Sequence, residues 1–492
     1  MRTLLQVLSE DEQAQVHERT LSILAKTGLR VDTAWGRQIL KDAGAEVDEN
    51  TQAVFSAIVR FPRALVEESL RLAPKEFILG ARRPGWDLHM NSGDCTLLID
   101  GEAMFVLDRE TGERRPGTTT DWLEATRLID AVDEIGVYWN MVERGDSGDT
   151  MADLVTYWRH LFCNFSKHVQ DGISTPDQAP WLLEVLQVIF GDKETIRRQH
   201  PLSFLLCPQS PLVIEGPYTD AYLALLGADK QHPLDIPLAV MPMPLMGATA
   251  PGSLISTTVL GNCEVLAMLC LVQAGAPGTP FIYAPALATM DPRSGRYSAG
   301  AMENGLMSAA SVEMARYYGL PVEASGGGTD HHVPGIQPGY ERALSSLLPV
   351  LSWPDILVGP GLLGGSMILS LEQLLIDVEV FRMCKRASLG IASDEAKWLE
   401  DVISGVGPGG GFLSERSTVR GIRGGEWYVS QLGWHDTFEA WEAAGKPTLL
   451  EEAREKVDRI LATHQPLPLE KDAERELDHI QKRAQEARSA SN

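Results

Sequence analysis

The chain has 492 residues, of which 67 are acidic and 43 basic, so its formal net charge is −24. Nucleic-acid binding and adhesion to an anionic membrane need a concentrated Lys/Arg surface, so the composition argues against both kinds of partner. The six cysteines show no close metal-ligand spacing, and the N-terminus lacks a signal-peptide pattern. We therefore expect a cytoplasmic protein without a structural metal or a disulfide framework.

The first 118 residues are predicted to form an extension of helices and a small β-meander. Ser9 begins a helix-capping pattern, and short β-like runs follow at 77–82, 96–101 and 104–110. Further along, the apolar window 254–274 is long enough to span a bilayer but carries Asn262 and Glu264. A carboxylate is costly inside a membrane, so this window predicts a buried helix of a water-soluble core.

Residues 119–404 alternate apolar, strand-like runs with helical stretches, which is typical of parallel strands joined by crossover helices. The eight predicted strands are 135–142, 166–173, 202–208, 237–246, 280–287, 321–327, 355–361 and 389–393. Their number and spacing predict a (β/α)₈ barrel. A doubly wound sheet is the alternative, but it needs an early glycine-rich turn that the sequence lacks. Residues 405–492 are predicted to be a loop and helical C-terminal extension.

In such a barrel the active site lies at the C-terminal ends of the strands. Trp139 and Tyr283 stand near two predicted strand ends, and aromatic faces are what proteins use to hold a quaternary ammonium ion. Ordinary core packing is the competing interpretation of both residues. His168 and Glu323 are further candidates on strands, but a ring of carboxylates and histidines typical of metallohydrolases is not evident.

The densest polar cluster lies at 326–341, directly after the sixth predicted strand. Its members are Gly326, Gly327, Gly328, Asp330, His331, His332 and Gln337. Metal binding, substrate or cofactor contact, and loop packing all stay open for this cluster. The stretch GPGLLGG at 359–365, with Gly361 and Gly364, is a candidate cofactor loop because phosphate-bearing groups often bind after the last barrel strands.

The segment PVEASGGGTDHHVPGIQPGYER (321–342) and the C-terminal pattern of 412–456 resemble the trimethylamine methyltransferase family over nearly the whole chain. The resemblance implies a barrel enzyme that moves a methyl group from an amine to the Co(I) corrinoid, a cobalamin carried by a partner protein. The family's pyrrolysine is absent, and His332 or His331 stands near its position. The chain is thus similar to the non-pyrrolysine branch, which includes glycine betaine methyltransferases.

This resemblance implies roles for the candidate residues. Trp139 and Tyr283 would hold the ammonium group, and His331, His332 or His168 would anchor a substrate carboxylate. Glu323 and Gln337 would contribute to the substrate site. The catalytic group would be His332, His331 and Asp330, and the 325–332 and 359–365 loops would face the corrinoid. A homo-oligomer is expected. A metal-dependent barrel hydrolase or lyase and a non-catalytic betaine-binding protein are the alternatives.

Overall fold

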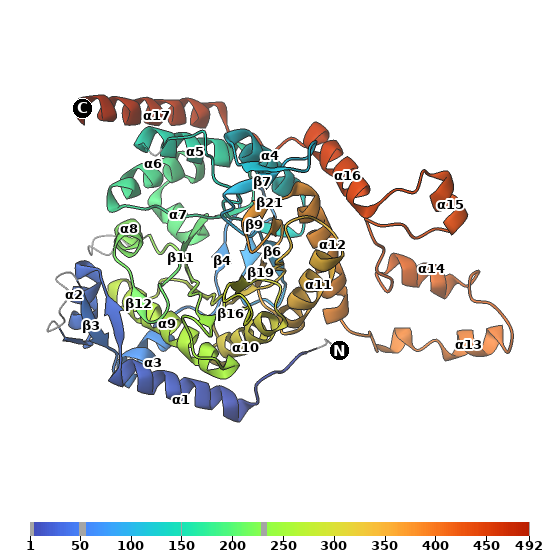
Figure 1. Cartoon of the computed structure of the whole chain (residues 1–492), viewed down its shortest axis with the longest axis horizontal. Coiled ribbons are helices and arrows are strands. Elements are labelled where there is room, and N and C mark those ends of the chain that lie inside the picture. The colour runs from blue at the N-terminus through green and yellow to red at the C-terminus, as the bar shows by residue number, and fades with distance from the viewer. Residues whose placement is uncertain (1–3, 49–55, 149, 228–233, 492) are drawn as a thin grey trace.

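The computed structural model describes residues 4–48, 56–148, 150–227 and 234–491 (Figure 1). Eight parallel strands form its central sheet, and their order around the sheet follows the chain. They are β6 (Thr96–Leu98), β9 (Ile135–Tyr138), β10 (His168–Gln170), β11 (Leu202–Leu206), β13 (Leu238–Val240), β15 (Phe281–Tyr283), β18 (Glu323–Ser325) and β19 (Ile356–Val358). A parallel bridge between Tyr283 and Val322 joins the two edges of this sheet. The predicted (β/α)₈ barrel is confirmed.

Helices surround the barrel, one or two after each strand, as Figure 1 shows in a view down the barrel. In chain order they are α4 (Thr119–Ala131), α5 (Met151–Asn164), α6 (Ala179–Phe190), α7 (Lys193–Gln199), α8 (Pro217–Leu226), α9 (Leu254–Gly275), α10 (Met302–Tyr318), α11 (Ile336–Leu351) and α12 (Leu371–Ser388). Side-chain caps fix several of their starts, for example a Thr118 and Asp121 capping box on α4. The strand–helix alternation read from the sequence therefore describes this layer correctly.

The strand prediction is wrong at one place. The eighth predicted strand, 389–393, is not a strand, and its Leu389 and Ile391 side chains are exposed. The missing barrel strand is β6, which the sequence analysis had assigned to the N-terminal meander. Residues 96–101 were predicted as a β-like run, but the β-strands at 105–107 and 114–116 follow before the next helix, so this run did not fit the strand–helix alternation. The predicted boundary at residue 118 consequently does not mark the start of the barrel sheet.

An N-terminal layer covers α9. It contains α1 (Glu10–Lys26), α2 (Ala34–Asp42) and α3 (Arg63–Leu72), with a sheet ordered β12 (Val213–Ile214), β1 (Leu29–Val31), β3 (Ala57–Arg60), β2 (Glu46–Asp48). Asn262 and Glu264 on α9 are fully buried, and each finds hydrogen-bond partners nearby. Among the described residues, α9 alone is long and apolar enough to cross a membrane, and it lies inside the protein. The prediction of a buried core helix is confirmed.

Short strands close and extend the barrel. The hairpin β4 (Ile78–Leu79) and β5 (Leu88–His89) packs against the side chains inside the barrel. Above the other end lie two small sheets, one of β14 (Leu245–Met246), β16 (Ala288–Met290) and β17 (Tyr297–Ser298). The other contains β7 (Phe105–Leu107), β8 (Arg114–Pro116), β20 (Leu362–Leu363) and β21 (Ile368–Leu369).

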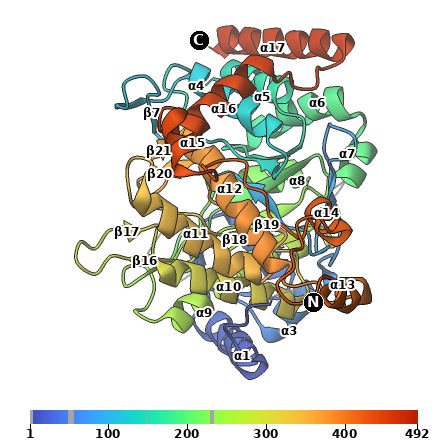
Figure 2. The ribbon, with the colours of Figure 1, turned by 90° about the vertical axis from the view of Figure 1, so that its right-hand side faces the viewer.

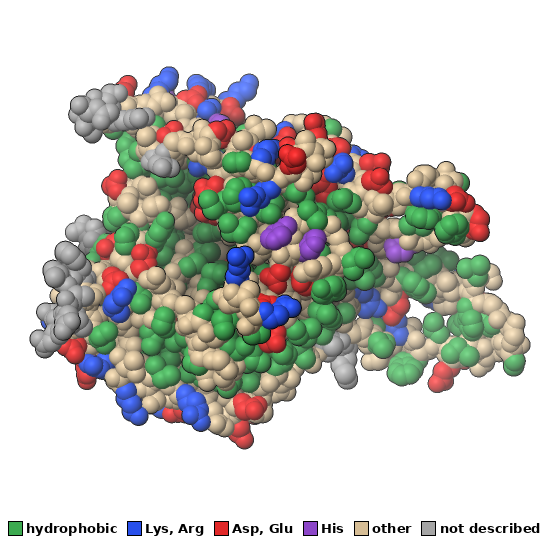
Figure 3. All heavy atoms as spheres, viewed as in Figure 1, with side chains coloured by type: hydrophobic (Ala, Val, Ile, Leu, Met, Phe, Trp, Pro, Cys, Tyr) green, Lys and Arg blue, Asp and Glu red, His purple; other side chains and the backbone are tan. Residues whose placement is uncertain are grey.

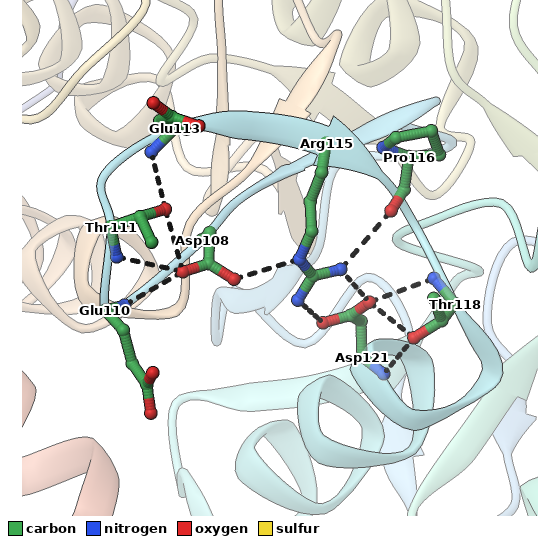
Figure 4. A network of polar contacts seen from close by, with 8 residues as sticks. All are labelled: Asp108, Glu110, Thr111, Glu113, Arg115, Pro116, Thr118 and Asp121. Carbon is green, nitrogen blue, oxygen red and sulfur yellow. Dashed lines mark hydrogen bonds and ion pairs between the residues drawn. The ribbon is translucent and has the colours of Figure 1, made fainter.

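The β7–β8 hairpin is tied to the start of α4 by a charged network (Figure 4). Arg115 donates to Asp108 at 3.0 Å and makes two hydrogen bonds to Asp121 at 2.7 and 2.8 Å. Asp121 also caps α4 through Thr118. These contacts hold the hairpin rigidly beside the barrel mouth, next to a cavity of about 380 Å³.

After α12 the chain leaves the barrel and then returns. Residues 391–443 form an arm with α13 (Glu400–Val406), α14 (Arg416–Arg423) and α15 (Phe438–Ala443), which Figure 1 shows beside the barrel. The chain then returns as α16 (Leu449–Thr463), which packs on α12 and α4, and α17 (Lys471–Ser491), which packs on α5 and α6 (Figure 2). We call residues 391–443 the C-terminal arm.

Candidate active site

A cavity of about 810 Å³ opens where β6, β9, β10 and β11 end. This is the end of the barrel at which barrel enzymes place their active sites. Figure 3 shows the space-filled molecule from the same side as Figure 1, with acidic, basic and histidine side chains gathered near the middle. The polar and aromatic residues that line the cavity include Glu102, Trp139, Glu143, Asp171, Phe204, Cys207, Gln209, Glu215 and Tyr218.

Trp139 is positioned at the cavity by its strand and by a glycine. Along β9 the side chains alternate, so Val137 and Trp139 face the barrel interior. The Trp139 ring lies directly against Gly101, where an added Cβ would come within 2.1 Å of its Cδ1 atom. Only glycine allows this approach. The structure therefore places Trp139 at the cavity, as the sequence analysis expected.

Three carboxyl groups near Trp139 have raised pKa values. Burial, followed by the charge of Glu143, raises the pKa of Glu102 to about 7, although water reaches its side chain through the cavity. Burial also raises the pKa of Asp171 to about 6 and that of Glu323 to about 8. Glu323 lies beneath the cavity and accepts a hydrogen bond from Gln170 Nε2 at 3.2 Å. Groups perturbed in this way gather at functional sites.

His168 lies at the other end of β10 and does not reach the cavity. Its Nδ1 lies 3.0 Å from the carbonyl oxygen of Gly80, next to the closing hairpin, and its Nε2 lies 2.8 Å from Ser203 Oγ. Burial lowers the pKa of His168 to about 3, so the ring is neutral. Since the carbonyl can only accept, Nδ1 carries the proton and Ser203 donates to Nε2. The expected contact of His168 with substrate is corrected to a structural role at the barrel floor.

Tyr283 also lies outside the cavity. On β15, Ile282 belongs to the interior cluster, so its neighbour Tyr283 points outward to the helices. Its hydroxyl donates to Asn262 Oδ1 at 2.9 Å, and its side chain is fully buried. The expectation that Tyr283 forms a cation cage with Trp139 is therefore wrong, and the packing interpretation holds.

The polar cluster after β18 organises its own loop. Both carboxylate oxygens of Asp330 accept hydrogen bonds, from Ser298 Oγ at 2.8 Å and from the Ala299 amide at 2.6 Å. Gln337 donates to Glu341, and His331 Nδ1 lies 2.8 Å from the carbonyl oxygen of Val333. None of Asp330, His331 and Gln337 lines the 810 Å³ cavity.

His332 is exposed and lies against the second glycine-rich loop, because a Cβ at Gly364 would come within 2.5 Å of His332 Nδ1. The Gly364 amide donates to the carbonyl of His331 at 2.8 Å. The loops 325–332 and 359–365 therefore pack together at the barrel mouth. Both loops were predicted to lie at this end of the barrel, but their direct contact was not predicted.

A buried arginine holds these two loops. Arg342 donates to the carbonyl oxygens of Gly327, Gly359 and Leu362 and forms an ion pair with Asp377 at 2.7 Å. Gly326 and Gly359 approach so closely that an added Cβ on Gly359 would lie 1.6 Å from the Gly326 oxygen. Similar crowding occurs at the other predicted cofactor glycines, Gly328, Gly361 and Gly364. The glycines are thus required for packing, whatever else the loops contact.

Sequence reasoning missed the carboxylates of the cavity. It found no ring of acidic groups, but Glu102, Glu143 and Asp171 line the same cavity as Trp139, and Glu323 contacts Gln170, the residue before Asp171. Glu102 was hidden because its strand, β6, was read as part of the extension. Asp171 carried one available signal, since it directly follows a predicted strand. In the described ranges, no three His, Cys, Asp or Glu side chains are grouped so that they could hold a metal ion.

A closed barrel with an acidic and aromatic cavity at its C-terminal end has the arrangement of a (β/α)₈ enzyme that acts on a small molecule. Sequence comparison defines the family. The model of the trimethylamine methyltransferase (MTTB) family matches residues 2–488, and the chain belongs to that family. It is therefore a methyltransferase by family.

Individual relatives align along almost the whole chain. Trimethylamine methyltransferase MttB of Desulfitobacterium hafniense (strain DSM 10664 / DCB-2) is 30% identical over 461 residues, covering 94% of this chain and 90% of the relative. The protein of the same name from Methanosarcina barkeri (strain Fusaro / DSM 804) is 30% identical over 98% of this chain and 96% of its own. A glycine betaine methyltransferase of D. hafniense (strain Y51) is 28% identical, covering 96% and 95%.

Proposed function

We propose that the protein transfers a methyl group from a small quaternary amine to the Co(I) corrinoid (cobalamin) of a cognate partner protein. The observation that carries this proposal is that Trp139 lines one cavity together with Glu102 and Asp171, two carboxylates that form no ion pair within the described residues. An aromatic face and negative charge together attract a cation that offers no hydrogen-bond donor. Similarity to a glycine betaine methyltransferase supports a quaternary amine, and glycine betaine or a related betaine is the candidate that sequence favours.

The chemistry requires little of the protein beyond binding and orientation. The C–N bond breaks, nitrogen keeps both electrons, and the tertiary amine leaves neutral without receiving a proton. The partner's Co(I) corrinoid, as the methyl acceptor, would supply the electron pair of the new bond to the methyl carbon and would be oxidised to Co(III). Trp139 would hold the ammonium group, and the cavity walls would exclude water and keep one methyl group turned toward the mouth.

The loop after β18 stands as a candidate for contacts with the corrinoid or the far end of the substrate. His331 and His332 lie at the barrel mouth with Asp330 anchoring their loop, which supports the predicted orienting role. The 325–332 and 359–365 loops lie side by side at that end. We therefore retain these loops, including Gly326 to Gly328, as the proposed corrinoid-facing surface.

A substrate panel tests the proposal. The purified full chain is mixed with Co(I) cobalamin and with glycine betaine, choline, tetramethylammonium, proline betaine, carnitine or trimethylamine, and the absorbance change to methyl-Co(III) is followed. Methyl transfer from a quaternary amine, lost in Trp139→Ala, is the expected result. Saturable binding without any transfer would identify a binding protein, and no transfer from any compound would refute the proposal.

We further propose that the chain forms a homo-oligomer through its C-terminal arm. Among described residues, α13, α14 and α15 contribute no buried side chain, while Trp398, Leu413 and Phe438 are 63%, 92% and 63% exposed. So much exposed apolar surface is typical of an interface. A second copy fits best because α14 carries Arg416, Arg420 and Arg423, and each copy has a net charge of −24.

Light scattering coupled to size-exclusion chromatography tests this assembly. A multiple of the 53.8 kDa chain mass is expected, with Leu413→Asp shifting the population toward monomer. A monomer at micromolar concentration would refute it. All six cysteines are free thiols, which supports the proposed cytoplasmic location.

A further inference from the structure

Five carboxylates stand in or just beneath the cavity wall without a basic partner. They are Glu102, Glu143, Asp171, Glu215 and Glu323. No ion pair involves any of them in the part of the chain that the structure describes, and no Lys or Arg is among the residues that line the cavity. Carboxylates at a protein surface are ordinarily solvated by water or paired with cations. Four of these five line a space large enough for a small ligand.

Asp171 is the most buried of the carboxylates that line the cavity. Its Oδ1 accepts the Gly172 amide at 2.7 Å and its buried Oδ2 has no hydrogen-bond partner within normal distance among the described residues, while burial raises the Asp171 pKa and the nearby Tyr157 hydroxyl partly opposes this rise. The cation that acts on it most is Arg144, whose guanidinium lies 4.4 Å from the ring centre of Tyr157. Arg144 does not line the cavity. The positive charge of a ligand in the cavity would stabilise the buried carboxylate of Asp171.

We infer that, within the quaternary amines, this cavity selects compounds with a net positive charge, such as choline or tetramethylammonium, over betaines. This inference rests on the proposed function and sharpens its substrate class. A betaine is the same cation joined to a carboxylate. In this cavity that carboxylate would face acidic side chains and meet no lining guanidinium or ammonium group, so like-charge repulsion would offset the attraction to the ammonium.

Binding of such a cation must be linked to protons. The pKa values of Glu102, Asp171 and Glu323 are raised to about 7, 6 and 8, so the empty cavity holds part of these groups protonated near neutral pH. The groups that face them are Glu143, Gln170, Arg144, Tyr157 and the Cys207 thiol, whose pKa is raised by desolvation at the cavity wall and by the charges of Glu323 and Glu102. A cation prefers the ionised carboxylates, so its affinity rises with pH from 6 to 8, and binding releases protons.

Calorimetric titration of the full chain without corrinoid tests the inference. The ligands are choline, glycine betaine and 3,3-dimethylbutan-1-ol, which is the uncharged shape match of choline. At pH 8 choline is expected to bind about tenfold or more tightly than either of the others, and its Kd should fall from pH 6 to 8. Glycine betaine binding as tightly as choline, or a choline Kd that does not change with pH, would overturn the inference.

A matched pair of variants assigns the effect to the cavity. Glu102→Gln should weaken choline binding about tenfold and leave or improve glycine betaine binding, whereas Glu124→Gln, beside the separate 380 Å³ cavity, should change neither. Equal choline affinity in Glu102→Gln and the parent chain would contradict the inference. The cobalamin assay separates the two proposals: efficient demethylation of glycine betaine but not choline would leave the methyltransferase proposal standing and refute this one.

Discussion

Replacing Arg342 with Met tests whether one buried ion pair holds the two loops at the barrel mouth. The Arg342 side chain is 1% exposed, and the change would leave three carbonyl oxygens without their donor and Asp377 without its cation. Asp377 would keep only the Gly361 amide at 2.8 Å and Gln373 Nε2 at 2.7 Å. Breaking a buried pair in this way costs about 3–5 kcal/mol of unfolding free energy.

The loss should depend on pH in a definite direction. Burial already raises the pKa of Asp377 to about 6, and Arg342 is the largest influence that lowers it. Without the guanidinium, this pKa rises further above its value in the unfolded chain, so the folded variant binds the extra proton. A folded state that holds more protons loses stability as pH rises. The difference between parent and variant should therefore grow from pH 6 to pH 8.

Urea unfolding followed by tryptophan fluorescence measures the effect. The control is Arg293→Met, because Arg293 also pairs with an aspartate, Asp291, but its side chain is 89% exposed. That change should cost less than about 1 kcal/mol. If Arg342→Met lowers the unfolding free energy no more than the control does, or if its effect becomes smaller toward pH 8, then the buried Arg342–Asp377 pair does not stabilise the two loops.

Three other changes give independent checks. Trp139→Leu should weaken binding of a quaternary amine by roughly 2-fold to 30-fold, measured by calorimetry, because a cation–π contact contributes about 0.5–2 kcal/mol. Burial raises the pKa of Glu264 to about 7, so the parent chain loses stability as pH rises from 4.5 to 7. Because glutamine does not ionise, the unfolding free energy of Glu264→Gln, measured by chemical unfolding, should gain on that of the parent by up to about 3 kcal/mol over this range. Gly359→Ala should lower the unfolding free energy by more than about 3 kcal/mol, because its Cβ would overlap the Gly326 oxygen. A Cβ at Gly335 meets nothing within 4 Å, so Gly335→Ala should be nearly neutral; thermal unfolding of both variants measures the difference.

The sequence predicted the barrel because apolar, strand-like runs alternate with helical stretches, most of them 10 to 22 residues long. It failed at β6, because the β7–β8 hairpin separates this strand from its helix α4 and the strand was grouped with the β-like runs beside it. The site was predicted only in part, because the direction of a side chain depends on strand register. Trp139 and Tyr283 are both aromatic residues at strand ends. Successive side chains along a strand point to opposite faces of the sheet, so Trp139 points into the cavity and Tyr283 points outward to Asn262.

The carboxylates show a second limit of sequence reasoning. Glu102 and Asp171 lie 69 positions apart in the chain, and neither belongs to a local motif. Only closure of the barrel brings them to one wall. The histidines and glycines at 326–332 were predicted as site residues because they are adjacent in sequence. In the structure, many contacts of this segment connect one loop to another.

Helices α16 and α17 come last in the chain but cover helices that are made much earlier, so the outer layer of the barrel can be completed only after α16 and α17 are synthesised. Helix α16 bridges α12 and α4, the last and first helices of the barrel, while Leu477 and Ile480 of α17 are buried over α5 and α6. His464 Nε2 lies 2.8 Å from Asp130 Oδ2, a residue made more than 300 positions earlier. During synthesis, the helices of the first three strand–helix units, α4, α5 and α6, therefore have their outer faces covered only after residues 449–491 have been made.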